Sequence, residues 1–196
     1  SVGLFDADIY GPSIPTMLST NKKLVMKEDS SLDPIMASGI KCMSFGYIEE
    51  SADEAAVLRG PMVSQITTQL LTSTNWGELD FLILDLPPGT GDIQITLCQL
   101  VQLTAAVIVT TPQHISFIDV VKGIEMFDSL NVPVIGAVEN MSYFQLEKNG
   151  KKQYPFGKGA LRRLKAEFGF DNTASIPMHA DVSFAGDTGS PLIITN

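Results

Sequence analysis

Several residue types are scarce in this chain of 196 residues. It has two cysteines, Cys42 and Cys98, too few for a disulfide framework, which indicates a reducing compartment. The chain has 13 basic and 22 acidic residues. The resulting net charge of −9 argues against a large surface that binds nucleic acid or adsorbs to a membrane. The longest apolar stretch, residues 103–109, is far too short to span a bilayer.

The remaining composition is that of an ordinary globular protein, with 44% hydrophobic and 18% charged residues. A chain of this length buries one sizeable core, so we expect a single domain over residues 1–196. The first five residues read as an apolar strand with no cap, turn or Met before them. We therefore expect the chain to be an N-terminally truncated piece of a fold.

Strand-like runs alternate with amphipathic helical patterns, which predicts βαβ units and a mostly parallel, doubly wound α/β sheet. The expected strands cover residues 2–5, 40–45, 81–84, 105–110, 134–138 and 173–176. Three of them, at 81–84, 105–110 and 134–138, are apolar enough to predict strands buried on both faces. The expected helices cover residues 62–72, 93–100, 117–130 and 159–168.

The first polar cluster, Asp6-Ala7-Asp8-Ile9-Tyr10-Gly11-Pro12-Ser13, follows the first strand. Two carboxylates at a strand end can divide their roles, one near a metal and one toward a water. A calcium loop does not fit, because Tyr10 occupies a ligand position and Met17 stands where a bidentate Glu is needed. A purely structural turn before Gly11 remains an equal alternative on this pattern alone.

The second cluster, Asp85-Leu86-Pro87-Pro88-Gly89-Thr90-Gly91-Asp92, follows another apolar strand. Open α/β sheets bind ligands at such strand ends, and in P-loop NTPases an Asp there holds magnesium. The prolines stiffen the exit from the strand, and the glycines let backbone N–H groups approach a phosphate. A rigid turn with Asp92 as a helix cap is the structural alternative.

The sequence holds only half of a nucleotide site, because Gly-x-x-x-x-Gly-Lys-Ser/Thr occurs nowhere in it. Gly157-Lys158-Gly159 looks like phosphate-binding chemistry, but it follows no buried strand and lacks that spacing, so a turn at a helix start is favoured. His114 and His179 have no Ser or Cys in a nucleophile context, so a hydrolase triad has no support.

A resemblance to a known family rests on motifs that run from end to end. They are Asp6–Ser13, Arg59-Gly60-Pro61-Met62, Asp85–Asp92, Thr110-Thr111-Pro112-Gln113, Glu139-Asn140-Met141 and Asp187-x-Gly-x-Pro191. Together they resemble the Mrp/Nbp-type iron–sulfur cluster carriers, a branch of the MinD/ParA-like deviant P-loop ATPases. Further runs, such as Thr96-Leu97-Cys98-Gln99, are similar to the plastid subtype known from the high-chlorophyll-fluorescence phenotype of plants.

The resemblance implies a MinD-like (SIMIBI) fold and a role for each matching residue. Asp85 corresponds to the carboxylate that binds Mg²⁺ through water, Asp6 to the first switch carboxylate near the metal, and Asp8 to the residue that orients the attacking water. The other implied contacts are Gly89, Thr90 and Gly91 beside the γ-phosphate, Asn140 reading adenine and Pro177 covering the base. The implied cofactors are ATP and Mg²⁺.

The family works as homodimers or related heterodimers that hold a [4Fe–4S] cluster and pass it to apo-proteins. Its Cys-Pro-x-Cys pair is missing from residues 143–150, as it is in the plastid subtype, so Cys42 and Cys98 are the remaining candidate cluster ligands, although core positions are favoured for both. The family also places a P-loop one strand and one helix before Val2, so we expect this chain to lack the first strand and the P-loop helix and to be inactive alone.

The leading hypothesis is therefore an ATP-dependent iron–sulfur carrier, expected in the plastid stroma, with the cytoplasm or mitochondrion as alternatives. A MinD/ParA-like positioning ATPase is a weaker alternative, because the acidic chain shows no basic surface and no amphipathic C-terminal helix. A partner subunit that has lost its P-loop is the third. We expect no binding to nucleic acid or membranes.

Overall fold

The structure is a computed structural model that describes residues 1–20, 22, 24, 27–28, 30–48, 60–146 and 150–195. These residues gather into two compact units. The first comprises Ser1–Pro88, Asp92–Leu97 and Asp181–Asn196, and the second comprises Gly89–Gly91 and Cys98–Ala180. Each unit is compact by itself, and the single domain expected for residues 1–196 stays a prediction.

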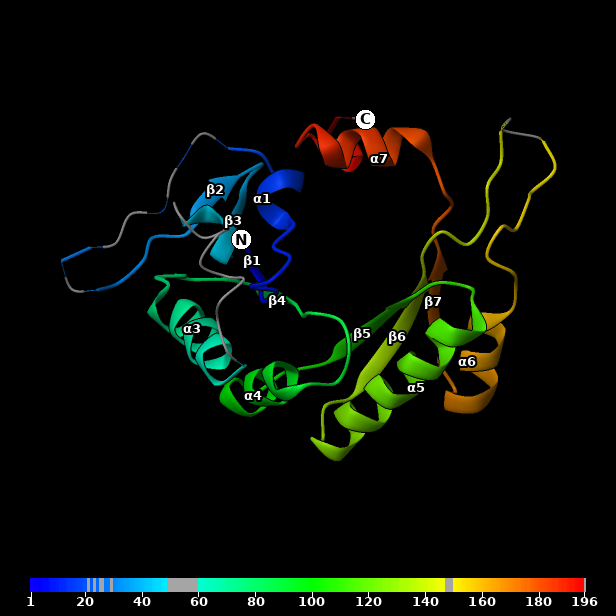
Figure 1. Ribbon diagram of the computed structural model, residues 1–196, viewed down its shortest axis with the longest axis horizontal. Helices are drawn as coiled ribbons and strands as arrows, with labels where there is room; N and C mark the ends of the chain where they lie inside the picture. Colours follow the sequence, from blue (N-terminus) through cyan, green and yellow to red (C-terminus); the bar gives the residue numbers. More distant parts are fainter. Residues whose placement is uncertain are drawn as a thin grey trace. The chain divides into compact units, whose positions relative to one another are not determined.

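The first unit is built on a four-stranded sheet in the order β2-β3-β1-β4 (Figure 1). Its strands are β1 (Val2–Asp6), β2 (Ile35–Ala37), β3 (Ile40–Ser44) and β4 (Phe81–Asp85). β1 lies between β3 and β4 and is parallel to both, whereas β2 is antiparallel to β3. The helical elements assigned wholly to this unit are α1 (Ile14–Met17), η1 (Phe45–Tyr47), α3 (Gly60–Ser73) and α8 (Leu192–Thr195).

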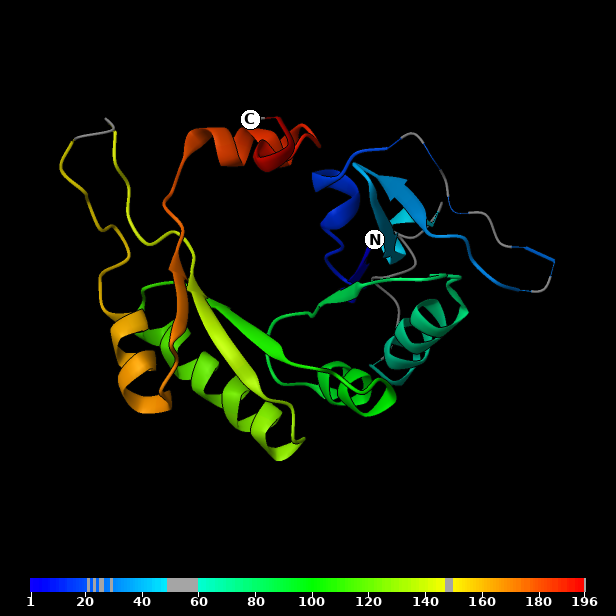
Figure 2. The same cartoon turned by 180° about the vertical axis from the view of Figure 1, so that it is seen from behind.

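The second unit is built on a three-stranded parallel sheet in the order β5-β6-β7. Its strands are β5 (Ala106–Thr110), β6 (Val134–Glu139) and β7 (Asn172–Ser175). Helices α5 (His114–Ser129) and α6 (Ala160–Phe168) run alongside this sheet, as the two opposite views show (Figures 1 and 2). Two further helices cross the boundaries of the units, namely α4 (Asp92–Leu100) and α7 (Ala180–Asp187).

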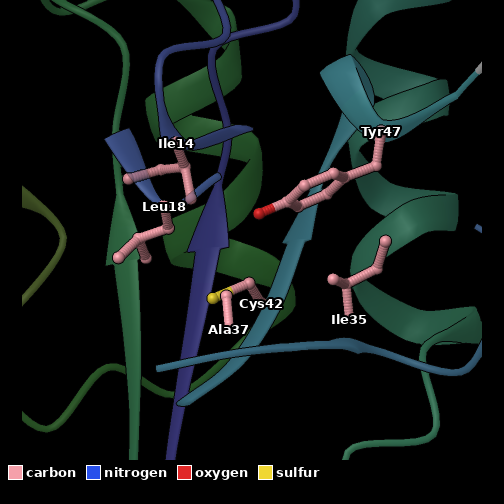
Figure 3. Packing of buried hydrophobic residues seen from close by; sticks show 6 residues of the cluster. All are labelled: Ile14, Leu18, Ile35, Ala37, Cys42 and Tyr47. Atoms are coloured by element: carbon pink, nitrogen blue, oxygen red, sulfur yellow. The ribbon is translucent and has the colours of Figure 1, made fainter. Parts of the chain in front are cut away.

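The core of the first unit joins α1 to the β2–β3 hairpin (Figure 3). Its buried members are Ile14, Leu18, Ile35, Ala37, Cys42 and Tyr47. The hydroxyl of Tyr47 is buried without a hydrogen-bond partner among the described residues. Burial raises the pKa of this phenol, and the nearby Cys42 and Asp6 raise it further, so Tyr47 stays neutral.

These elements confirm the predicted α/β class with mostly parallel strands. All six predicted strands and all four predicted helices are present, with ends shifted by a few residues. The sequence reasoning missed short elements, namely α1, β2, η1, α7 and α8. Within the part of the chain that the structure describes, no helix is both long and apolar enough to cross a membrane.

The prediction that β4 and β5 are buried on both faces is wrong. In β4, Phe81 is 69% exposed and Ile83 53% exposed. In β5, burial alternates, with Val107 55% and Val109 64% exposed. In β5 the exposed side chains alternate with buried ones, as they do where only one face of a strand is packed.

Candidate functional site

The site begins with two carboxylates at the ends of neighbouring parallel strands. Asp6 is the last residue of β1 and Asp85 the last residue of β4, and the two are register partners. The N–H of Ala7 donates to the carbonyl of Asp85 at 2.9 Å, so the pairing continues past both strand ends. Neighbouring strands lie about 4.8 Å apart, which brings both side chains to one point on the same edge.

Asp6 is 3% exposed, and both oxygens of its carboxylate accept hydrogen bonds. Its Oδ1 accepts from the N–H of Asp8 at 3.1 Å. Its Oδ2 accepts from the N–H groups of Ser13 at 3.1 Å and Ile14 at 3.2 Å, and from the hydroxyl of Ser44 at 3.0 Å. One buried carboxylate thus fixes the loop after β1, the start of α1 and the end of β3.

Asp8 shapes the same loop from within. Its Oδ1 accepts from the N–H groups of Tyr10 at 3.1 Å and Gly11 at 3.0 Å, which is a side-chain turn of the kind aspartate favours. The structural role that the sequence left open for Asp6 and Asp8 is therefore present. It does not conflict with a functional role, because it holds both carboxylates in place next to Asp85.

Electrostatics links the three aspartates. Partial loss of hydration raises the pKa of Asp85, and repulsion from Asp6 and then from Asp8 raises it further. A cluster of like charges at a strand end is costly unless a cation neutralises it. The arrangement therefore suits a divalent ion at the end of β4.

The described residues contain no group of three or more His, Cys, Asp or Glu side chains that could hold a metal ion by themselves. Mg²⁺ keeps several waters and is bound by one or two carboxylates together with substrate phosphates. The oxygens of Asp6 already accept four hydrogen bonds, whereas the role of Asp85 as the Mg²⁺ ligand stays a prediction.

The loop after β4 is held by a residue that the sequence reasoning missed. Gln94 in α4 is 3% exposed, and its Nε2 donates to the carbonyls of Pro87 at 2.8 Å and Pro88 at 3.2 Å. The signal was a polar residue three positions before the buried Leu97, on the apolar face of a helix. Gln94 fixes the path of the chain as it leaves Asp85.

The next three residues, Gly89, Thr90 and Gly91, are exposed. Gly89 has a φ of 95°, a left-handed conformation that favours glycine. Helix α4 begins at Asp92, one residue earlier than expected, and Asp92 lies in its first turn. An exposed glycine loop that opens a helix suits contact with an anion, and a γ-phosphate contact stays a prediction.

Two further candidates share an edge of the second sheet. Asn140 follows β6, and its N–H donates to the carbonyl of Thr110 at 2.7 Å. Pro177 follows β7, and the N–H of Ser142 reaches the carbonyl of the neighbouring Ile176 at 2.9 Å. The N–H of Ser142 thus joins the loop that carries Asn140 to the loop that carries Pro177, and a shared contact with a base stays a prediction.

The two cysteines differ in setting. Cys42 is fully buried in the α1–hairpin core, and burial raises its thiol pKa to about 11 (Figure 3). Cys98 in α4 is partly exposed, and burial also raises its pKa. Because metals bind the thiolate, Cys42 fits a core role better than a ligand role. Arg59, part of one family motif, lies outside the described residues.

Comparison with known proteins gives the same family along the whole chain. Residues 1–196 match the family described as "ParA: NUBPL iron-transfer P-loop NTPase". The "Fe-S cluster assembly factor HCF101, chloroplastic" of Oryza sativa subsp. japonica is 50% identical, over 100% of this chain and 36% of the relative. The "Iron-sulfur cluster carrier protein" of Aquifex aeolicus is 43% identical, over 100% of this chain and 54% of the relative.

A solved structure agrees with the fold. The nucleotide-binding protein of Archaeoglobus fulgidus, in complex with ADP, matches with a TM-score of 0.80 and 34% identity, covering 96% of this chain and 74% of that chain. The chain spans between about a third and about half of the length of the two curated relatives above.

Proposed function

Since the chain belongs to the NUBPL iron-transfer P-loop NTPases, we propose that it forms the core of an ATP-dependent carrier that assembles [4Fe–4S] clusters and transfers them to apo-proteins. One observation carries this proposal. Asp6 and Asp85 are register partners at the ends of β1 and β4, so two carboxylates lie at one edge of a sheet. The chain that holds them matches an iron-transfer family over its full length. The printed names of the relatives, an assembly factor and a cluster carrier, support the same activity.

Asp6, Asp8 and Asp85 are the residues that we propose for ATP hydrolysis. Asp85 would hold Mg²⁺ and so supply the charge that binds phosphate, and Asp6 would support it while its Oδ2 fixes the loop after β1. Asp8, held at the turn by its two backbone contacts, orients the attacking water. Magnesium bound there would neutralise phosphate charge during hydrolysis.

The glycine loop and the second sheet supply the remaining nucleotide contacts. Gly89, Thr90 and Gly91 approach the γ-phosphate through their backbone N–H groups. Asn140 reads the adenine, and Pro177 covers it from the loop after β7. The solved relative in complex with ADP supports a nucleotide as ligand.

The cluster is the cargo of the reaction, and its ligands are the open part of the proposal. Cys98 is the better candidate of the two cysteines, because Cys42 is sealed in a core. Anaerobic reconstitution of Cys42→Ala and Cys98→Ala with ferrous iron and sulfide tests this through absorbance in the iron–sulfur charge-transfer band. We expect Cys42→Ala to keep the band and Cys98→Ala to weaken it, and an unchanged band in Cys98→Ala would exclude that ligand.

The partners follow from the same premise. We propose a homodimer or a related heterodimer that serves apo iron–sulfur proteins and neither nucleic acid nor membranes. A plastid stromal location is supported by the chloroplastic relative at 50% identity. The cytoplasm and the mitochondrion are the alternatives.

Cluster transfer tests the function directly. The full product of the gene, including any residues encoded before Ser1, is loaded with cluster and mixed with an apo-ferredoxin, with and without Mg²⁺ and ATP. We expect the acceptor to gain its cluster, and the rate of transfer to change when Mg²⁺ and ATP are added. An acceptor that gains nothing from the loaded protein beyond free iron and sulfide would overturn the proposal.

A further inference from the structure

A small cavity lies in the second unit, at the starts of α5 and α6. It has a volume of about 260 Å³ and is formed by the starts of α5 and α6 and the loop before α6. Its walls are Pro112, His114, Phe117, Phe156, Gly157, Lys158, Gly159, Ala160 and Arg163. The proposed nucleotide and cluster chemistry uses none of these residues.

The cavity is positively charged in an acidic protein. Lys158 and Arg163 line it, and none of the described lining residues is acidic. The surrounding segment, residues 150–165, carries six of the 13 basic residues of the chain and no Asp or Glu, although the chain as a whole has a net charge of −9. Cations gathered around a cavity favour an anionic ligand.

Arg163 is held in place at the cavity wall. Its Nη1 donates to Nδ1 of His114 at 3.0 Å, and its guanidinium carbon lies 3.9 Å from the ring centroid of Phe117. Its Nη2 lies 3.4 Å from Oε1 of Glu167, one turn further along α6. Because a guanidinium only donates, Nδ1 of His114 is the acceptor of this hydrogen bond. A side chain fixed in this way loses little freedom when it binds a ligand.

Lys158 is also positioned, and the loop around it is open. Its Nζ lies 3.7 Å from the ring centroid of Tyr154. The flanking glycines have left-handed φ values of 87° at Gly157 and 100° at Gly159. A Cβ at either glycine would meet no heavy atom within 4 Å, so there is free space beside the loop.

The start of α6 alone does not make this site. Oε2 of the buried Glu139 already accepts from the N–H of Leu161 at 3.3 Å, so a carboxylate of the protein occupies part of the first turn. The attraction for a ligand comes instead from the two cationic side chains and from the open glycine loop.

We propose that this cavity binds a phosphate group, with Arg163 and Lys158 as its ligands and His114 as the residue that orients Arg163. The planar fork of arginine matches phosphate oxygens, and lysine adds a second positive charge. The volume of about 260 Å³ is below the roughly 300–1,000 Å³ of pockets for drug-sized ligands, so the ligand is inorganic phosphate or the phosphate of a small ester.

A titration followed by backbone amide NMR tests the site. Inorganic phosphate and phosphoserine are added separately at pH 7, with sodium chloride at matched ionic strength as the reference. We expect saturable shifts at Gly157, Gly159 and Ala160 with phosphate and none with chloride. If inorganic phosphate and phosphoserine bind with equal affinity, the ligand is free phosphate. If phosphoserine binds more tightly, the ligand is a phosphate ester. Either result supports the site.

Three variants with the same loss of charge decide between a site and general electrostatics. Arg163→Gln and Lys158→Gln should each weaken binding about tenfold, the loss of one charge-assisted hydrogen bond. Arg162→Gln removes a neighbouring exposed cation that does not line the cavity, and it should leave the affinity unchanged. Equal weakening in all three variants, or no saturable shift in the wild type, would overturn the proposal. The amide spectrum of each variant reports its folding.

Discussion

Asp6 and Asp85 end two parallel strands in the same register, and the N–H of Ala7 donates to the carbonyl of Asp85 at 2.9 Å just beyond them. Their environments differ. Asp6 is buried and accepts four hydrogen bonds, whereas the pKa of Asp85 is raised by lost hydration and by its acidic neighbours. The first is a structural anchor, and the second is a charge that needs a counterion.

Replacing the anchor should destabilise the first unit. In the wild type, the carboxylate of Asp6 accepts hydrogen bonds from N–H and O–H donors. Asp6→Asn places an amide NH₂, itself a donor, against some of them, so we expect a loss of about 3 kcal/mol in the free energy of unfolding. Chemical denaturation measures it. Asp119→Asn, which breaks an exposed pair with Lys122 at 3.5 Å, is the control and should change stability by less than about 0.5 kcal/mol. Equal effects of the two substitutions would contradict the anchoring role.

Removing the charge of Asp85 should stabilise the protein without magnesium. Because the folded-state pKa is raised, the folded state binds this proton more tightly than the unfolded state, and ionisation at neutral pH costs stability. Asp85→Asn should therefore raise the melting temperature at pH 7 in a chelating buffer. The gain should vanish below the ordinary aspartate pKa of 3.8, where the wild-type carboxyl is protonated in both states. A lower melting temperature at pH 7 would contradict the electrostatic description.

Strong local patterns explain what could be predicted from the sequence. The apolar run of β4 and the prolines and glycines after it specify a strand, a turn and a helix start by their own backbone preferences. Asp6 and Asp85 could be expected to meet because parallel strands end at one edge of a sheet. The roles implied for Asp8, Asn140 and Pro177 stay predictions.

Features that depend on tertiary context could not be predicted. The composition of β4 does not reveal whether the faces of the strand are covered, so its exposure was missed. Strand β2 is only three residues long and α1 only four, too short for a periodic signal. The position of Gln94 on the apolar face of its helix marks it in the sequence, but its two acceptors, the carbonyls of Pro87 and Pro88, become visible only in the structure.

Gln94 should matter through these two contacts. Gln94→Leu keeps the helix and its packing but leaves the carbonyls of Pro87 and Pro88 without their donor, so we expect a loss of about 1–3 kcal/mol in unfolding free energy. Gln99→Leu, at an exposed position of the same helix, is the matched control and should be near neutral. If both variants unfold at the same denaturant concentration, Gln94 does not hold the loop.

Gly189 should not tolerate a side chain. It has a φ of 67°, and a Cβ there would lie 2.1 Å from Cβ of Ser19 and 2.9 Å from its backbone N. Gly189→Ala should therefore lower stability by about 1–3 kcal/mol. Gly186→Ala provides the contrast in α7, because its Cβ would meet nothing within 4 Å, and it should be neutral or slightly stabilising. Thermal unfolding of both variants decides this, and an unchanged Gly189→Ala would show that the contact with Ser19 does not form.

The most direct test of the proposed function is the effect of Asp85 on magnesium-dependent ATP hydrolysis by the full product of the gene. If Asp85 holds the metal, Asp85→Asn should lower the rate by about 10²–10³, the range expected when a group that stabilises transition-state charge is lost. Asp119→Asn, with the same loss of charge outside the site, should keep the wild-type rate. Hydrolysis at the wild-type rate in Asp85→Asn would contradict the account.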